Sequence, residues 1–82
     1  MTLRNLLKLH QDGCVGCVSI MQEPYDQEKH GYTKTYFEEE NQEAILKSSV
    51  FKQIANKKVD HFNVIGGGSL YELELCIYLE KE

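Results

Sequence analysis

The sequence predicts an α+β domain with the order α-β-β-α-β-β, in which two helices cover one face of an antiparallel four-stranded sheet. Near the C-terminus, residues 71–80 alternate between apolar and polar side chains, a period of two that is typical of a strand with one buried face. Residues 42–57 instead repeat apolar side chains every three and four positions, which indicates an amphipathic helix. A chain of 82 residues has room for one two-layer core, so we expect residues 1–82 to form a single domain.

The N-terminal part predicts a helix followed by a strand. Thr2 can cap a helix that runs to about His10, and residues 11–13 end in a glycine, which accepts the left-handed conformation found at many helix ends. The leucines at helical spacing are Leu3, Leu6 and Leu7. Residues 14–21 are rich in small and β-branched apolar side chains and predict the first strand.

A polar segment separates this strand from the next one. Residues 22–31 contain the only proline and show no periodicity, so they predict a loop, which we interpret as a mobile connection. Residues 32–37 alternate again and are rich in tyrosine and threonine. They predict a second strand that pairs antiparallel with the first.

The second predicted helix begins after Asn41, a favourable N-cap residue that follows three glutamates at positions 38–40. The apolar residues at helical spacing are Ile45, Leu46, Val50, Phe51, Ile54 and Ala55. Ser48 and Ser49 interrupt the helix-forming composition. Two alternatives stay open: one continuous helix, or a new helix capped by Ser49 with residues 43–48 as an additional strand.

Residues 59–79 predict a hairpin with a turn at Gly66-Gly67-Gly68-Ser69. A phosphate-binding glycine loop would lead into a helix and usually carry a lysine, whereas this segment leads into a strand. We expect the apolar face of the hairpin to pack against the helices. The sheet residues expected in this core are Phe62, Val64, Leu73, Leu75 and Ile77, and the helix residues are Leu6, Leu46, Val50, Phe51 and Ile54.

The composition argues against several classes of function. A net charge of −4 with scattered basic residues argues against direct nucleic-acid binding, which depends on clustered Lys and Arg. No apolar run approaches the length of a membrane span, so no membrane association is expected. Three cysteines cannot all pair within one chain, and the N-terminus lacks a signal-peptide pattern. We therefore expect a cytoplasmic protein with reduced thiols.

Cys14 and Cys17 have the CxxC spacing of zinc sites and redox motifs. A structural zinc site needs further ligands at matching spacing, and a redox motif needs a helix that begins at the first cysteine; the sequence shows neither. We expect small buried cysteines and no metal or other cofactor. A metal-binding or redox protein that uses this pair is the alternative function.

The densest acidic cluster lies before the second helix, next to a tyrosine-rich strand. Its carboxylates are either solvated or dock on a basic surface of another protein, and the tyrosines would add the aromatic anchors that are enriched in interfaces. The predicted partner-binding residues are Tyr25, Tyr32, Tyr36, Glu38, Glu39 and Glu40. No catalytic set is evident, so we expect a non-enzymatic protein that binds another protein.

The sheet face away from the helices is expected to carry Leu70, Cys76 and Tyr78 among glutamates. Such a mixed face is either hydrated or the interface of a symmetric homodimer, and both alternatives stay open. Self-association makes a structural protein the third functional hypothesis.

Three stretches of the chain carry a resemblance. They are Thr2-Leu3-Arg4-Asn5-Leu6-Leu7, Val59-Asp60-His61-Phe62-Asn63-Val64 and Leu73-Glu74-Leu75-Cys76-Ile77. Their apolar pattern resembles that of small acidic proteins of unknown function from bacterial phages and integrative mobile elements, from which residues 22–31 and the CxxC pair depart. The resemblance implies an accessory protein of a mobile element, in a group that includes inhibitors of host defence such as anti-CRISPR proteins. It implies no particular site residues.

Overall fold

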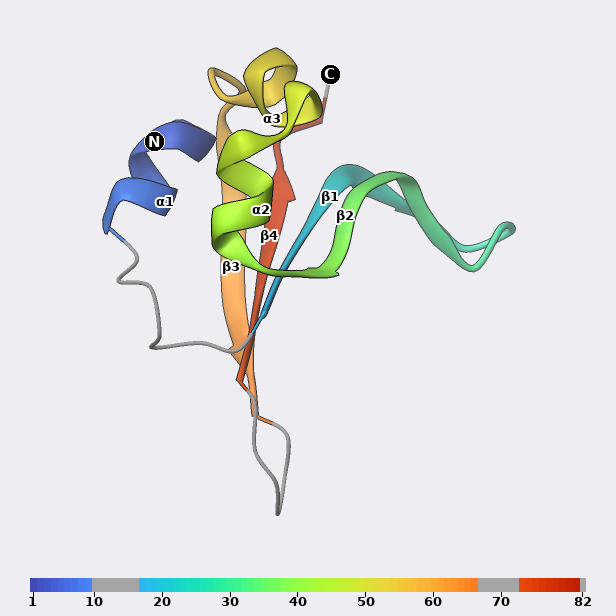
Figure 1. Ribbon diagram of the computed structural model, residues 1–82. Helices are drawn as coiled ribbons and strands as arrows, with labels where there is room; N and C mark the ends of the chain where they lie inside the picture. Colours follow the sequence, from blue (N-terminus) through green and yellow to red (C-terminus); the bar gives the residue numbers. More distant parts are fainter. Residues whose placement is uncertain (10–16, 67–72, 82) are drawn as a thin grey trace.

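The computed structural model describes residues 1–9, 17–66 and 73–81, which form one mixed sheet and three helices (Figure 1). The elements are α1 (Leu3–Leu9), β1 (Cys17–Asp26), β2 (Gly31–Glu40), α2 (Gln42–Lys47), α3 (Ser49–Ile54), β3 (Val59–Ile65) and β4 (Glu74–Leu79). The α+β class is as predicted. Cys14, Leu70 and most of the predicted glycine turn lie outside the described residues. Within those residues, no helix is long and apolar enough to cross a bilayer.

The strands lie in the order β2-β1-β4-β3, so the two central strands come from different hairpins. The pairs β1–β2 and β3–β4 are antiparallel, as expected. The central pair β1–β4 is parallel, with Ile20 beside Ile77, and the prediction of an entirely antiparallel sheet is therefore wrong. The chain crosses the sheet through α2 and α3 between the two hairpins, and this crossover brings β4 alongside β1 in the same direction.

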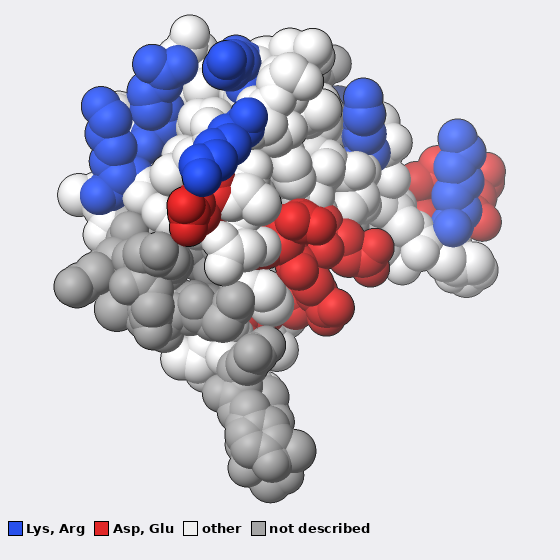
Figure 2. Space-filling view, in the orientation of Figure 1, with Lys and Arg blue, Asp and Glu red and all other residues white. Residues whose placement is uncertain are grey.

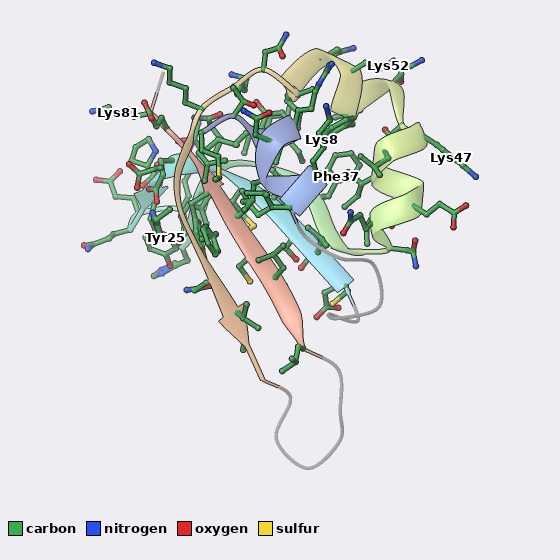
Figure 3. The ribbon with its side chains drawn as sticks, turned by 90° about the vertical axis from the view of Figure 1, so that its left-hand side faces the viewer. Lys8, Tyr25, Phe37, Lys47, Lys52 and Lys81 are labelled. Carbon is green, nitrogen blue, oxygen red and sulfur yellow. The ribbon has the colours of Figure 1, made fainter. Side chains whose placement is uncertain are left out.

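One apolar core fills the space between the helices and the two central strands. Its fully buried large side chains are Leu3, Val18, Ile20, Ile45, Ile77 and Leu79. Thr2 caps α1 as predicted, because its hydroxyl accepts a hydrogen bond from the Asn5 N–H at 3.2 Å. The side-chain amide of Gln42 donates to the Leu7 carbonyl at 3.2 Å and ties α1 to α2. Figure 3 shows Phe37 on the helix side of the sheet.

The predicted helix over residues 42–57 is interrupted at Ser48, which gives three helices instead of two. The Ser48 hydroxyl accepts a hydrogen bond from the Val50 N–H at 3.1 Å, and the Ser48 N–H donates to the Ile45 carbonyl. Ser48, and not Ser49, is therefore the cap. The alternative of a strand over residues 43–48 is wrong, because α2 is helical and is capped by Asn41 as predicted.

This interruption changes which helix side chains reach the core. Ile45, Phe51 and Ile54 are buried, whereas Leu46 and Val50, both expected in the core, are exposed. A continuous helix would place all these residues along one stripe. Because α2 and α3 are separate helices, each presents its own face to the sheet.

The apolar side chains of β3 are also placed differently from the prediction. Phe62 and Val64 were expected in the core but are 50% and 52% exposed, and Leu73, which precedes β4, is exposed as well. The core joins the helices to β1 and β4, while β3 is an edge strand beside β4. The helices therefore leave much of the apolar surface of β3 uncovered.

The connection between the first two strands is much shorter than predicted. β1 continues through Pro24 to Asp26, so the loop expected over residues 22–31 is wrong, and residues 27–30 form a tight turn. The Asp26 carboxylate accepts hydrogen bonds from the backbone N–H groups of Glu28 and Lys29, at 2.9 and 3.3 Å. Figure 1 shows this hairpin projecting away from the helices.

Candidate functional site

The acidic residues predicted to bind a partner lie where β2 meets α2. Glu38, Glu39 and Glu40 end the strand and are exposed, and Glu43 follows in the first turn of the helix. We call these four residues the acidic corner. Glu43 pairs with Lys47 at 3.0 Å, whereas within the described part of the chain no ion pair involves the other three glutamates. Figure 2 shows acidic side chains gathered in the middle of one face, with most Lys and Arg side chains above them.

The backbone of the acidic corner is anchored to the neighbouring strand. The β1–β2 register shifts between Val18 and Ile20, and Glu39 has a positive φ of 49° at this irregularity. Its N–H donates to the hydroxyl oxygen of the buried Ser19 at 2.9 Å, and that hydroxyl donates to the Glu74 carboxylate at 2.5 Å. Ser19 thus links β2 to β4 across β1, and the acidic corner sits on a defined backbone.

The structure brings two of the three predicted tyrosines together. The rings of Tyr25 and Tyr32 meet edge to face at 5.1 Å, and Tyr32 also contacts Tyr78 at 5.2 Å. Tyr78 in turn stacks on His61, with ring centroids 4.4 Å apart and ring planes within 14°. These four side chains, one from each strand, form an aromatic row on the sheet face away from the helices. Figure 3 shows Tyr25 on that side.

The third predicted tyrosine lies elsewhere. Tyr36 packs against the helix-side core, and the Lys34 ammonium lies 4.9 Å from its ring centroid. A register shift between Ile20 and Met21 adds a residue to β2 next to Tyr36, which breaks the alternation that would have placed it with Tyr32. Tyr36 is therefore not part of the aromatic row.

Cys76 and Tyr78, predicted on a possible dimer face, are already 3% and 8% exposed in the single chain. Burial, reinforced by the nearby Glu74 carboxylate, raises the pKa of the Cys76 thiol to about 11. Burial, followed by the neighbouring Tyr32, raises the pKa of Tyr78 to about 12. Both groups therefore stay protonated at neutral pH. Cys17 begins β1 and is partly buried, but its predicted CxxC partner lies outside the described residues.

A group of potential metal ligands that was not predicted from the sequence lies at the end of the aromatic row. An imidazole nitrogen of His61 lies 2.6 Å from an Asp60 carboxylate oxygen and 3.8 Å from one of Glu23. Glu23 belongs to β1 and the other two residues to β3, so they meet only after both strands have paired with β4. No local sequence pattern signals this encounter.

Among the described residues, the acidic corner and the aromatic row are separate from each other and lie outside the helix-side core. The acidic corner offers carboxylates to a cationic surface. The aromatic row exposes Tyr25 at one end and His61 at the other, and two carboxylates lie beside His61. In comparisons of this chain with protein-family models, curated proteins and solved structures, no match was found.

Proposed function

We propose that the protein acts by binding another protein, without catalysing a reaction, and that the acidic corner is its main contact. The observation that carries this proposal is the arrangement of Glu38, Glu39 and Glu40. Their side chains are exposed, and the structure gives them no ion-pair partner among the described residues. A partner surface rich in Lys and Arg would supply the missing countercharge.

The anchored backbone favours such binding. Because Ser19 holds the Glu39 N–H, less backbone freedom is lost when a partner docks on the acidic corner. Exposed charges at an interface mainly increase the association rate and make it depend on salt. The proposed complex is therefore salt-sensitive.

The type of partner follows from the same chemistry. Surfaces that bind nucleic acid are rich in Lys and Arg, and a row of carboxylates can occupy them in place of phosphates. The proposal is therefore that the protein competes with nucleic acid for a basic surface. The resemblance to small mobile-element proteins would make the partner a component of host defence and this protein its inhibitor.

Affinity capture from a bacterial lysate tests the proposal with two matched variants. The double reversal Glu38→Lys with Glu40→Lys changes the acidic corner and leaves Glu39, with its left-handed backbone, in place. The control, Glu28→Lys with Glu80→Lys, makes the same change of net charge at exposed positions elsewhere. The native and control proteins should retain the same partner, and the corner variant should lose it. Equal retention by all three would remove the acidic corner from the proposed function.

A further inference from the structure

We infer that Glu23, Asp60 and His61 form a binding site for a divalent transition-metal ion of the zinc type. Each residue offers one ligand atom, and the three atoms lie within 4.8 Å of one another. The donor set, one imidazole nitrogen and two carboxylate oxygens, is one that such ions bind. This site is separate from the acidic corner and does not depend on the proposed function.

The site exists because β3 contains one extra residue. Val59 pairs with Leu79 and His61 with Tyr78, so Asp60 has no counterpart on β4 and forms a bulge. In a regular strand, adjacent side chains point to opposite faces. Here the carboxylate of Asp60 and the imidazole of His61 come within 2.6 Å of each other. The bulge thus converts two consecutive residues into a pair of ligands.

The orientation of the imidazole is set by its neighbour. The ring of His61 stacks on Tyr78, which is buried and lies directly opposite it on β4. The stack limits rotation of the imidazole and keeps Nδ1 turned towards both carboxylates. A fixed ring loses less freedom when it binds a metal ion.

The two carboxylates of the site, those of Glu23 and Asp60, favour the binding of a cation. The Nδ1 atom can donate only one hydrogen bond, and Asp60 is the closer acceptor. The Glu23 carboxylate, whose side chain is only 21% exposed, makes no other side-chain hydrogen bond or ion pair within the described residues, and neither carboxylate pairs there with Lys or Arg. A partly buried carboxylate whose nearest polar partner is an imidazole nitrogen 3.8 Å away lacks a close countercharge. A metal ion between the three groups would neutralise both carboxylates.

The distances are compatible with coordination after small side-chain rotations. With metal–ligand bonds of about 2.0–2.2 Å, neighbouring ligand atoms are about 3.0–3.5 Å apart. The two distances from Nδ1, 2.6 and 3.8 Å, lie on either side of this range. Calcium prefers six to eight oxygen ligands and is disfavoured by this set. Three protein ligands would leave at least one position for water or for a group from another molecule.

Isothermal titration of the untagged protein with zinc chloride tests the inference. The titrations use a Cys14→Ser/Cys17→Ser background, which removes the CxxC pair as a competing site. One zinc ion should bind per chain, Glu23→Gln should weaken binding by at least about tenfold, and His61→Ala should abolish it. His30→Asn, a change of an exposed histidine in the β1–β2 turn to a residue that tolerates its positive φ of 55°, is the control and should bind normally.

Two further measurements check that the variants are folded and which ligand atoms bind the metal. Circular dichroism should show that the variants are folded, since His61 is about half exposed and Glu23→Gln keeps the size of the side chain. In the cobalt-loaded native protein, visible d–d bands without the near-ultraviolet charge-transfer band of a thiolate ligand would indicate nitrogen and oxygen ligands. The inference is overturned if zinc does not bind in the cysteine-free background, or if Glu23→Gln and His61→Ala bind zinc as tightly as their parent.

Discussion

One face of the sheet is covered by three helices and the other is not, yet the central strand β4 is buried on both faces. On the helix side, Leu75, Ile77 and Leu79 belong to the main apolar core. On the open side, Cys76 and Tyr78 form a second cluster with Met21, and Tyr32 packs against it. The first face is covered by a separate layer, whereas the second is covered largely by side chains of the sheet itself.

The two faces of the sheet differ in what they contribute: the helix side contributes mainly stability, and the open side carries polar and aromatic groups. The helix side is mainly apolar and should account for most of the free energy of unfolding, which comes mainly from apolar burial. The open side combines aromatic rings, a thiol, the Ser19–Glu74 hydrogen bond and the proposed metal ligands. The aromatic rings, the thiol and the proposed metal ligands are therefore gathered on the face that has no helical cover, whereas the acidic corner lies where β2 meets α2.

The largest expected difference in stability between the two faces comes from substitutions at neighbouring residues of β4. Ile77 points to the helix-covered face and Cys76 to the open face, and both are buried. Ile77→Ala should lower the free energy of unfolding by about 2–5 kcal/mol, because it leaves a cavity in the main core. Cys76→Ala removes one sulfur atom and should cost about 1 kcal/mol. Urea unfolding followed by circular dichroism measures both, and equal losses would contradict the assignment of stability to the helix side.

The aromatic row should contribute a smaller amount. Tyr78→Leu removes the ring contacts with Tyr32 and His61, and since aromatic pairs contribute about 0.5–1.5 kcal/mol each, we expect a loss of about 1–3 kcal/mol. Tyr78→Phe keeps the ring and should retain most of this stability. If the two variants are equally destabilised in urea, ring contacts do not hold the open face together.

Ser19→Ala tests the polar link on the open face. The substitution removes the acceptor of the Glu39 N–H and the donor to Glu74, and we expect a cost of about 1 kcal/mol. Amide hydrogen exchange at Glu39 should accelerate, while exchange in the centre of β4 should change little. An unchanged exchange rate at Glu39 would show that Ser19 does not anchor the acidic corner.

Two groups on the open face, Cys76 and Tyr78, should make the stability of the protein depend on pH in the alkaline range. The pKa values of Cys76 and Tyr78 are raised in the folded protein, from 9.0 to about 11 and from 10.0 to about 12. Between pH 9 and 12 the unfolded chain therefore releases protons that the folded chain keeps, so stability falls as the pH rises. Urea unfolding at several alkaline pH values should show a flatter profile for Tyr78→Phe. An unchanged profile would contradict the raised pKa.

The local elements were largely predictable from the sequence. Thr2 and Asn41 cap helices as their side chains suggested, and the alternation around Leu75 and Ile77 predicted a strand with a buried face. The parallel pairing of β1 with β4 was not predictable, because alternation does not encode the direction of a neighbouring strand. Phe62 is exposed because this strand order places β3 at the edge of the sheet, and its exposure was therefore not predictable either.

The candidate sites were predictable only where they are continuous in the chain. Residues 38–40 form an acidic run that the sequence displays directly. The other candidate sites depend on two bulges that the sequence does not reveal. One bulge, in β2, separates Tyr36 from Tyr32, and the other, in β3, turns Asp60 towards His61. A single extra residue reverses the facing of every side chain beyond it, and single-sequence periodicity does not reveal where the extra residue lies.

The most direct test of the central claim is the dissociation constant of the captured partner at low and at high salt. The native protein is compared with Glu38→Gln/Glu40→Gln, which preserves the size of the side chains and removes two charges. We predict weaker binding of the variant at low salt and a smaller loss of affinity as salt rises. Equal dissociation constants with equal salt dependence would show that the acidic corner does not bind the partner.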